Sequence, residues 1–320
     1  MKMVYIVLSG LALGAMPLAK FPEAGISNGL IKAKLYLPDE KKGYYQGVRF
    51  DRSGNMPELE YAGHTFLGQW FEKYDPKVHD AIMGPVEDFQ PVEFNLKKPG
   101  EQFLKIGCGM LVKPDSKVYT IRKLYDNANP GKWTVKKSPD HVLFIHELKD
   151  KEYSYHYEKD VRLAAGKPEL ILSHTLRNTG TKTIETTVYD HNFFMIDNQP
   201  VGPGIEILFP YDISGDGLGI GPEKYVTISG RKISFNKNVD KDSTAYCSDL
   251  KGYGSEASDY DIRIENTVTR AGVRITCDQP IVRLPFWCCW KTACPEPYIA
   301  VKAEPGKEMK WNIKYEFYTF

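Results

Sequence analysis

Two residues far apart in the chain have types and settings that suit proton transfer. His191 lies in the stretch Tyr-Asp-His-Asn-Phe-Phe, among aromatic residues. Glu296 lies between two prolines in Cys-Pro-Glu-Pro-Tyr, a setting that stiffens the backbone and supplies no N–H from either proline. Imidazole and carboxyl groups are common general acids and bases. The alternatives are a packed structural histidine and an exposed glutamate in a turn.

Polar and aromatic residues near these two are candidates for holding a ligand. Asp197 belongs to the polar run that follows His191, and such a run is costly to bury without partners. Trp290 lies just before the Glu296 segment, so an aromatic platform can adjoin the carboxyl group. Carboxylates beside aromatic rings are typical of carbohydrate clefts.

Two further clusters lie nearer the amino end. His79 and Glu87 belong to the segment between residues 74 and 89, which is rich in acidic residues. Arg49 and Asp51 alternate with apolar residues, a pattern that predicts a strand. Arg49 is a candidate ligand-binding residue, and a salt bridge between Arg49 and Asp51 is the structural alternative.

The elements that must position these residues are predicted to be strands. Short apolar or β-rich runs occupy residues 141–148, 169–175 and 182–194, and turn-forming residues separate them. Residues 311–317 alternate between apolar and polar side chains, which indicates a strand with one buried face. In a strand through residues 187–195, Tyr189, His191 and Phe193 would share one face. No long amphipathic helical pattern occurs, so we expect an all-β fold, a large antiparallel β-sandwich.

Composition limits the kinds of partner. The chain has 320 residues, with 42 Lys and Arg against 41 Asp and Glu, which leaves a formal net charge of +1. So balanced a chain has no overall field to attract nucleic acid or an anionic membrane. A neutral substrate fits this balance. The length suits a single large domain, which we place at residues 25–320. No sequence feature indicates an oligomeric state.

The amino end predicts export. Residues 1–19 combine a lysine, a short apolar run and small residues, as in a signal peptide. The run is too short to cross a bilayer, so no membrane insertion is expected after its removal. A periplasmic or extracellular location follows, or a cytoplasmic one if the segment is not a signal. The six cysteines lack the paired spacing of a zinc site, and we expect buried thiols and no metal.

The motifs around His191 and Glu296 resemble those of the aldose 1-epimerases, the galactose mutarotases. The His191 segment is similar to the family's N-H-x-Y-F motif, and the Glu296 segment with the later Pro-Gly and Tyr-x-Phe is similar to its closing motif. His79 is a looser match to the upstream histidine. The resemblance implies a mutarotase-like supersandwich that interconverts the α and β anomers of a free or terminal aldose without metal or cofactor.

The resemblance also implies roles. Glu296 would be the base at the C1 hydroxyl and His191 the acid at the ring oxygen, at opposite edges of one pyranose. Their proximity would favour a carboxylate and an imidazolium. His79 and Arg49 would hold hydroxyls or developing charge. A carbohydrate-binding or accessory domain without turnover, and an epimerase of hexose phosphates, are the alternatives; a polysaccharide lyase or hydrolase is a more distant one.

Overall fold

The computed structural model describes residues 21–215 and 225–320. The predicted signal segment, residues 1–19, lies outside these residues, so the signal and the export stay predictions. The first described strand, β1, begins at Glu23. Almost all regular structure in the described part is strand, which confirms the expected all-β class. In these residues, no helix is both long and apolar enough to cross a membrane.

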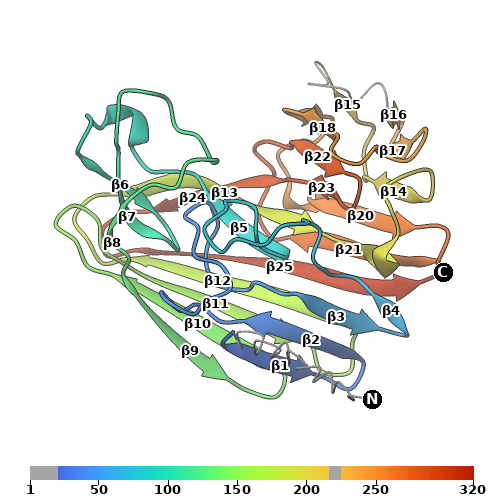
Figure 1. Cartoon of the computed structure of the whole chain (residues 1–320), viewed down its shortest axis with the longest axis horizontal. Coiled ribbons are helices and arrows are strands. Elements are labelled where there is room, and N and C mark those ends of the chain that lie inside the picture. Colours follow the sequence, from blue (N-terminus) through green and yellow to red (C-terminus); the bar gives the residue numbers. More distant parts are fainter. Residues whose placement is uncertain (1–20, 216–224) are drawn as a thin grey trace, which may run out of the picture.

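A ten-stranded antiparallel sheet forms the base of the molecule (Figure 1). In spatial order its strands are β16 (Val226–Ser229), β17 (Lys232–Phe235), β14 (Ile205–Leu208), β20 (Asp261–Asn266), β21 (Ala271–Cys277), β25 (Glu308–Thr319), β12 (Glu169–Asn178), β11 (Tyr155–Leu163), β10 (His141–Leu148) and β9 (Lys132–Lys137). The apolar run at residues 141–148 is β10, as predicted. The alternation near the carboxyl end is part of β25, whose buried side chains alternate with more exposed ones, as predicted.

Five smaller antiparallel sheets complete the described fold, together with three single turns of 3₁₀ helix. Their strands are β1 (Glu23–Ser27), β2 (Ile31–Tyr36), β3 (Glu58–Tyr61) and β4 (His64–Thr65); β24 (Tyr298–Ala303), β13 (Ile184–Phe193) and β5 (Gly84–Phe89); β18 (Thr244–Cys247), β22 (Phe286–Cys289) and β23 (Ala293–Pro295); β6 (Gln102–Lys105), β7 (Gly109–Val112) and β8 (Asn127–Asn129); and β15 (Ser214–Gly215) with β19 (Leu250–Lys251). The 3₁₀ turns are η1 (Phe94–Leu96), η2 (Ile196–Asn198) and η3 (Ala257–Asp259).

The sheet β24-β13-β5 packs over the large sheet and forms the sandwich (Figure 1). Aromatic side chains fill the space between the layers. The ring of Phe89 on β5 lies 6.2 Å from that of Trp311 on β25, and both side chains are fully buried. Removing an aromatic side chain of this size from water stabilises the fold by about 1.5–3 kcal/mol. The core therefore fixes β5 and β13 on the large sheet.

A group of buried polar residues also lies between these layers; we call it the inner cluster. It comprises Asp51, Glu87, Lys159, His174 and Asp190, none of which is more than 2% exposed. Lys159 pairs with Glu87, and Nε2 of His174 lies 2.6 Å from the same carboxyl group. Buried charges persist only when they are paired in this way.

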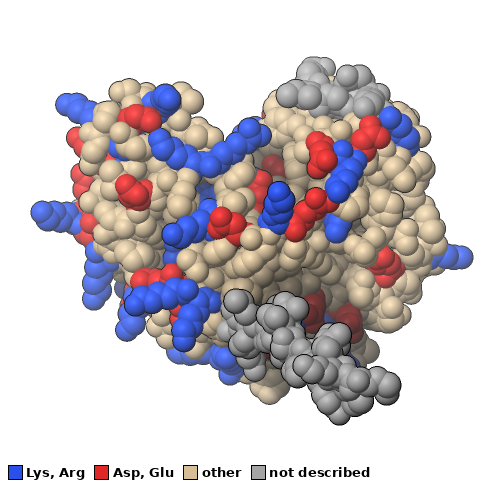
Figure 2. All heavy atoms as spheres, in the orientation of Figure 1, with Lys and Arg blue, Asp and Glu red and all other residues tan. Residues whose placement is uncertain are grey.

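Two lobes rise above the sandwich. One carries β6, β7 and β8, and the other carries β15, β18, β22 and β23 beside β14, β16 and β17, the strands at one end of the large sheet (Figure 1). The strands β5, β13 and β24 lie between them. Figure 2 shows that this face of the molecule is hollowed between the two lobes, with both basic and acidic side chains in the hollow.

Candidate functional site

His191 and Glu296 meet because of the register between β13 and β24. Tyr189 on β13 is the partner of Tyr298 on β24. The chains run antiparallel, so moving two residues along each strand brings His191 opposite Glu296. Nε2 of His191 lies 3.1 Å from Oε1 of Glu296. Pro297 has no N–H to donate, so the hydrogen-bonded ladder ends there and β24 begins only at Tyr298.

The same alternation defines the site face. We use this name for the side of β5, β13 and β24 that carries Asp88, Tyr189, His191 and Tyr298, together with Glu296 just before β24. Tyr189, His191 and Phe193 share this face, as the sequence predicts: the rings of His191 and Phe193 stack at 3.8 Å. Asp190 points to the opposite side, where it accepts a hydrogen bond of 2.6 Å from the hydroxyl of Tyr315.

Aromatic rings surround the histidine. The ring of Trp287 on β22 meets His191 edge-on at 5.5 Å, and Trp70 stacks on Phe193 at 4.9 Å. Trp70 and Trp287 also contact each other at 5.5 Å, and both are only partly buried. Indole faces at the edge of a polar pair suit the apolar face of a sugar ring. The aromatic wall beside the pair is therefore Trp70 and Trp287.

Arg49 is held on the site face by two carboxylates and a phenol. Its guanidinium pairs with Asp80, donates to Asp88 at 3.0 Å, and donates to the hydroxyl of Tyr189 at 2.8 Å. Nε2 of His79 lies 2.9 Å from Asp80. The structure therefore brings Arg49 and His79 into one network beside His191. The predicted strand through Arg49 is wrong, because residues 48–51 form an irregular loop. The structural alternative, a salt bridge to Asp51, is wrong as well, because Arg49 pairs with Asp80 and Asp88 instead.

One tyrosine ties the two loops of this network together. The hydroxyl of Tyr45 accepts from the backbone N–H groups of Arg49 and Phe50 at 3.3 Å, and it donates to the carbonyl of His79 at 2.9 Å. A Cβ on Gly47 would come within 2.4 Å of that hydroxyl oxygen, so only glycine lets the loop pass so close. The Arg49 segment and the His79 loop are therefore placed as one unit.

Burial reverses the protonation expected for the central pair. It raises the pKa of Glu296 to about 8, against the lowering effect of Arg49. Burial, together with the positive charge of Arg49, holds the pKa of His191 well below its usual value. At neutral pH the carboxyl group thus keeps its proton and the imidazole is neutral. The pair still holds one proton and one free lone pair, which are an acid and a base.

The contact between the two groups also changes how a ligand can reach them. The side chains are 4% and 8% exposed for His191 and Glu296. The resemblance implies that the two groups lie at opposite edges of one pyranose. This expectation is wrong, because the two side chains touch and leave no room for a sugar ring between them. A sugar ring can meet both only from the same side, next to the half-buried Trp287.

Three of the sequence candidates lie elsewhere. Glu87 belongs to the inner cluster, since alternation on β5 turns it away from the site face while Asp88 faces it. Asp197 accepts from the ring of His64 at 2.8 Å and from the backbone of Thr65, and so ties η2 to β4. Trp290 follows the end of β22 and packs against the main core, with the ammonium of Lys291 over its ring.

Other site residues were not among the candidates. Trp287 occupies the place expected of Trp290: it lies on an unpredicted strand, β22, and contacts His191, whereas Trp290 follows the end of that strand. Asp80 and Asp88 hold Arg49. The sequence signal that could have identified them is their place in the acidic segment, directly after His79 and Glu87. Tyr298 stacks on Tyr189 at 4.4 Å, which only the strand register reveals.

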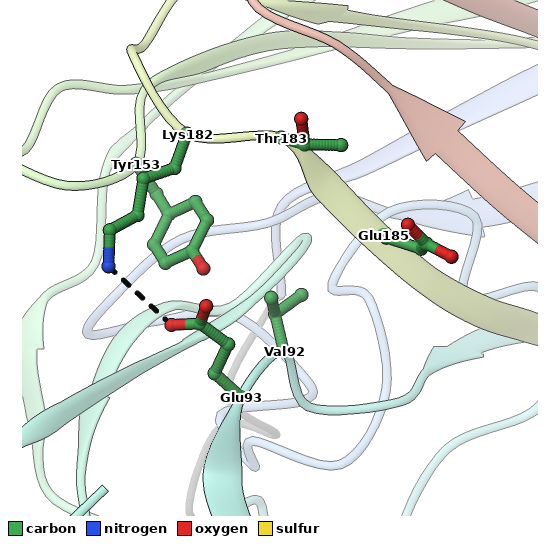
Figure 3. A pocket seen from close by; sticks show the side chains of 6 residues that line it. All are labelled: Val92, Glu93, Tyr153, Lys182, Thr183 and Glu185. Carbon is green, nitrogen blue, oxygen red and sulfur yellow. Dashed lines mark ion pairs between the residues drawn. The ribbon is translucent and has the colours of Figure 1, made fainter. Parts of the chain in front are cut away.

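Two separate hollows adjoin the β6–β8 lobe. One, of about 350 Å³, is lined by six residues (Figure 3): Val92, Glu93, Tyr153, Lys182, Thr183 and Glu185. The other, of about 430 Å³, is lined by residues that include Lys97 and Glu152. Lys182 pairs with both Glu93 and Glu152, so its charge is already compensated. Neither hollow is lined by a histidine, so we place the candidate site at His191 and Glu296. No cluster of residues suited to a metal occurs in the described residues.

Together the fold and the site define a class of protein: a large antiparallel β-sandwich with an imidazole–carboxyl pair beside an aromatic wall. No protein-family model and no curated protein matches the chain. Solved structures do match. A GalM/aldose epimerase homologue from C. elegans superposes with a TM-score of 0.55 at 14% identity, covering 94% of this chain and 99% of that one.

Two further structures agree. A galactose mutarotase-like protein from Lactobacillus casei gives a TM-score of 0.53 at 12% identity, covering 92% of this chain and 100% of that one. One from Clostridium acetobutylicum gives 0.53 at 15% identity, covering 93% and 95%. The chain thus has the galactose mutarotase-like fold, as the sequence motifs implied. Similarity at these identities establishes the fold, and function must be argued from the site.

Proposed function

We propose that this protein is an aldose 1-epimerase-like enzyme that interconverts the α and β anomers of an aldose. The observation that carries the proposal is the 3.1 Å contact between His191 and Glu296 on the site face, beside Trp287. Anomer exchange needs a base at the C1 hydroxyl and an acid at the ring oxygen, and this pair supplies one of each. The galactose mutarotase-like fold agrees with that chemistry.

The protonation of the buried pair suggests the direction of each transfer. The neutral imidazole of His191 takes the proton of the C1 hydroxyl, the electrons of that O–H bond form the carbonyl, and the C1–O bond of the ring breaks. The ring oxygen takes the proton of Glu296. Rotation about the C1–C2 bond and the reverse transfers close the ring on the other face, so neither residue is consumed. These roles are the reverse of those that the sequence resemblance implies.

The intermediate leaves the pair charged, and the neighbours stabilise it. After ring opening, His191 is an imidazolium and Glu296 a carboxylate, which attract each other at 3.1 Å. The guanidinium of Arg49 lowers the pKa of Glu296, so it also favours the carboxylate form. Arg49 is rigidly held by Asp80 and Asp88 and needs no rearrangement to do this. His79, which contacts Asp80 in the same network and is 24% exposed, is the candidate to bind a ring hydroxyl.

Exchange NMR tests the proposal directly. The rate of interconversion of α- and β-glucose and of α- and β-galactose would be measured with and without the protein at pH 7. An increase proportional to protein concentration is the expected result. A rate equal to that of buffer for both sugars, at protein concentrations that bind them, would reject catalysis of these sugars.

A carbohydrate-binding module without turnover is the second candidate. It is favoured by the small exposed fraction of His191 and Glu296, 4% and 8%, which leaves the aromatic wall as the larger accessible surface. In this case glycosides that cannot open would bind as well as free sugars, and the exchange rate would stay at the buffer value. The two measurements together separate the enzyme from the binding module.

A further inference from the structure

A second arginine, Arg283, lies at the edge of the site face. The backbone of Arg283 pairs with that of Tyr298: the N–H of Tyr298 donates to the carbonyl of Arg283 at 2.8 Å. The N–H of Glu296 donates to the carbonyl of Pro285 at the same distance. Arg283 is therefore the diagonal cross-strand neighbour of Glu296. Diagonal neighbours lie within reach of long side chains, with backbones about 7–8 Å apart.

The guanidinium of Arg283 is held by neutral groups. It lies over the ring of Tyr298 at 5.2 Å, donates to the carbonyl of Ser248 at 3.1 Å, and donates to the hydroxyl of Tyr246 at 3.3 Å. In the described part of the chain, no carboxylate forms an ion pair with it, and its Nη1 atom makes no hydrogen bond. The side chain is exposed, and its hydrogen bonds fix its orientation. A guanidinium held in this way can bind an anionic group of a ligand.

The other charges nearby are already committed. Arg49 is shared between Asp80 and Asp88. Asp249 is the acidic residue closest in sequence to Ser248, and it pairs with Lys251 while also accepting from the backbone of Leu284 at 3.0 Å. Arg283 thus adds, at the edge of the site face, a positive charge that has no carboxylate partner among the described residues. This charge also lowers the pKa of Glu296, a smaller effect than burial and than Arg49.

We propose that Arg283 binds an anionic group on the sugar, so that the preferred substrate is an aldose with a carboxylate or phosphate at C6. This inference rests on the proposed function, and its argument is geometric. The carbon that carries C6 is bonded to the ring oxygen. A sugar whose ring oxygen meets Glu296 therefore directs its C6 substituent to a near neighbour of Glu296, and Arg283 is such a neighbour on the same face.

The test compares three free sugars by exchange NMR: glucose, glucuronate and glucose 6-phosphate. We expect kcat/KM for at least one anionic sugar to exceed that for glucose about tenfold or more, as suits a charge-assisted contact. Glucuronate and glucose 6-phosphate distinguish the carboxylate from the phosphate. The Arg283→Gln variant should bring this ratio close to one, and Arg283→Lys should keep part of it. Arg162→Gln is the matched control, because Arg162 lies on β11 and already pairs with Asp160.

Binding of methyl glycosides, which cannot open, separates this inference from the proposed function. Methyl glucuronide or methyl glucoside 6-phosphate should bind more tightly than methyl glucoside, and Arg283→Gln should remove the difference, whether or not any sugar is turned over. Equal binding of all three would overturn the inference, as would a preference that Arg283→Gln leaves unchanged. Lack of exchange with every free sugar, together with the expected binding preference, would reject the enzyme and keep the role of Arg283.

Discussion

The carboxyl group of Glu296 touches the imidazole of His191 because Tyr298 is paired with Tyr189 two residues away on each strand. Their separation in the sequence is large, but the contact is local in the sheet. Pro297 ends the ladder between β13 and β24 at this point, so Glu296 lies next to a strand end, where a ligand can approach.

The first prediction concerns the pair itself. Glu296→Gln and His191→Asn each remove one proton-transfer group while keeping a similar shape. We expect each variant to lose catalysed anomer exchange by about 10²–10⁴-fold. Polarimetry on fresh α-glucose measures the loss, and circular dichroism with thermal melting checks that the variants are folded. Wild-type rates in both folded variants would contradict the roles proposed here.

The second prediction concerns the pH dependence of activity. The pair is active when it holds a single proton, which at neutral pH resides on Glu296. Since burial raises the pKa of Glu296 to about 8, that proton is lost above pH 8 and the rate should fall there. Burial holds the pKa of His191 well below its usual value, so no loss is expected between pH 6 and 7. A profile of kcat/KM from pH 5 to 10 checks this, and a rate that rises through pH 8 would refute it.

The third prediction uses Asp190 to test the inner cluster. Burial raises its pKa to about 7 in the folded protein. Between its ordinary value and pH 7 the native state keeps a proton that the unfolded state releases, so the free energy of unfolding falls as the pH rises through this range. Asp190→Asn removes this dependence. We expect the variant to gain about 3 kcal/mol relative to wild type between pH 5 and pH 9, measured by urea unfolding.

The fourth prediction distinguishes a residue of the core from a residue of the site. Glu87→Gln leaves Lys159 buried without its carboxylate, so we expect a loss of about 3 kcal/mol in unfolding free energy. The affinity for sugars should not change, because Glu87 does not face the site. Chemical unfolding and a sugar titration give the two readouts. A weaker affinity for sugars with unchanged stability would instead show that Glu87 belongs to the binding site.

The fifth prediction compares two tryptophans. Trp287 contacts His191, whereas Trp290 packs against the main core. Trp287→Ala should weaken sugar binding about tenfold or more by removing the aromatic wall. Trp290→Ala should lower stability by about 3 kcal/mol or more and leave affinity unchanged in the folded fraction. Titration by NMR together with thermal melting compares them, and the reverse pattern would place the ligand beside Trp290.

The sequence was sufficient to predict that the elements are strands and which side chains share one face of a strand. Alternation predicted β25 and the shared side of Tyr189, His191 and Phe193, because side chains on a strand repeat every two residues. A predicted β22 would also have separated Trp287, which lies on the strand, from Trp290, which follows its end. Isolated motifs do not carry that information.

Long-range pairing and burial could not be predicted. Arg49 pairs with Asp80, which lies in a loop, and with Asp88, which lies on β5. Local spacing in the sequence instead favoured Asp51 as the partner of Arg49. The protonation of Glu296 depends on how much water the folded chain excludes, which no short motif encodes. Sequence reasoning thus named the central residues of the candidate site but assigned them the wrong charge states.

The two neighbouring acids of β5 have a consequence for folding. Glu87 is bound to Lys159 on one side of the strand and Asp88 to Arg49 and Lys105 on the other. A slip of β5 by one residue would put an apolar neighbour, Val86 or Phe89, in the place of one carboxylate. Either Lys159, or Arg49 and Lys105, would then lose that partner. Misaligned versions of this layer are therefore penalised electrostatically. The charges on β5 thus favour the one alignment of this strand that places Asp88 on the site face.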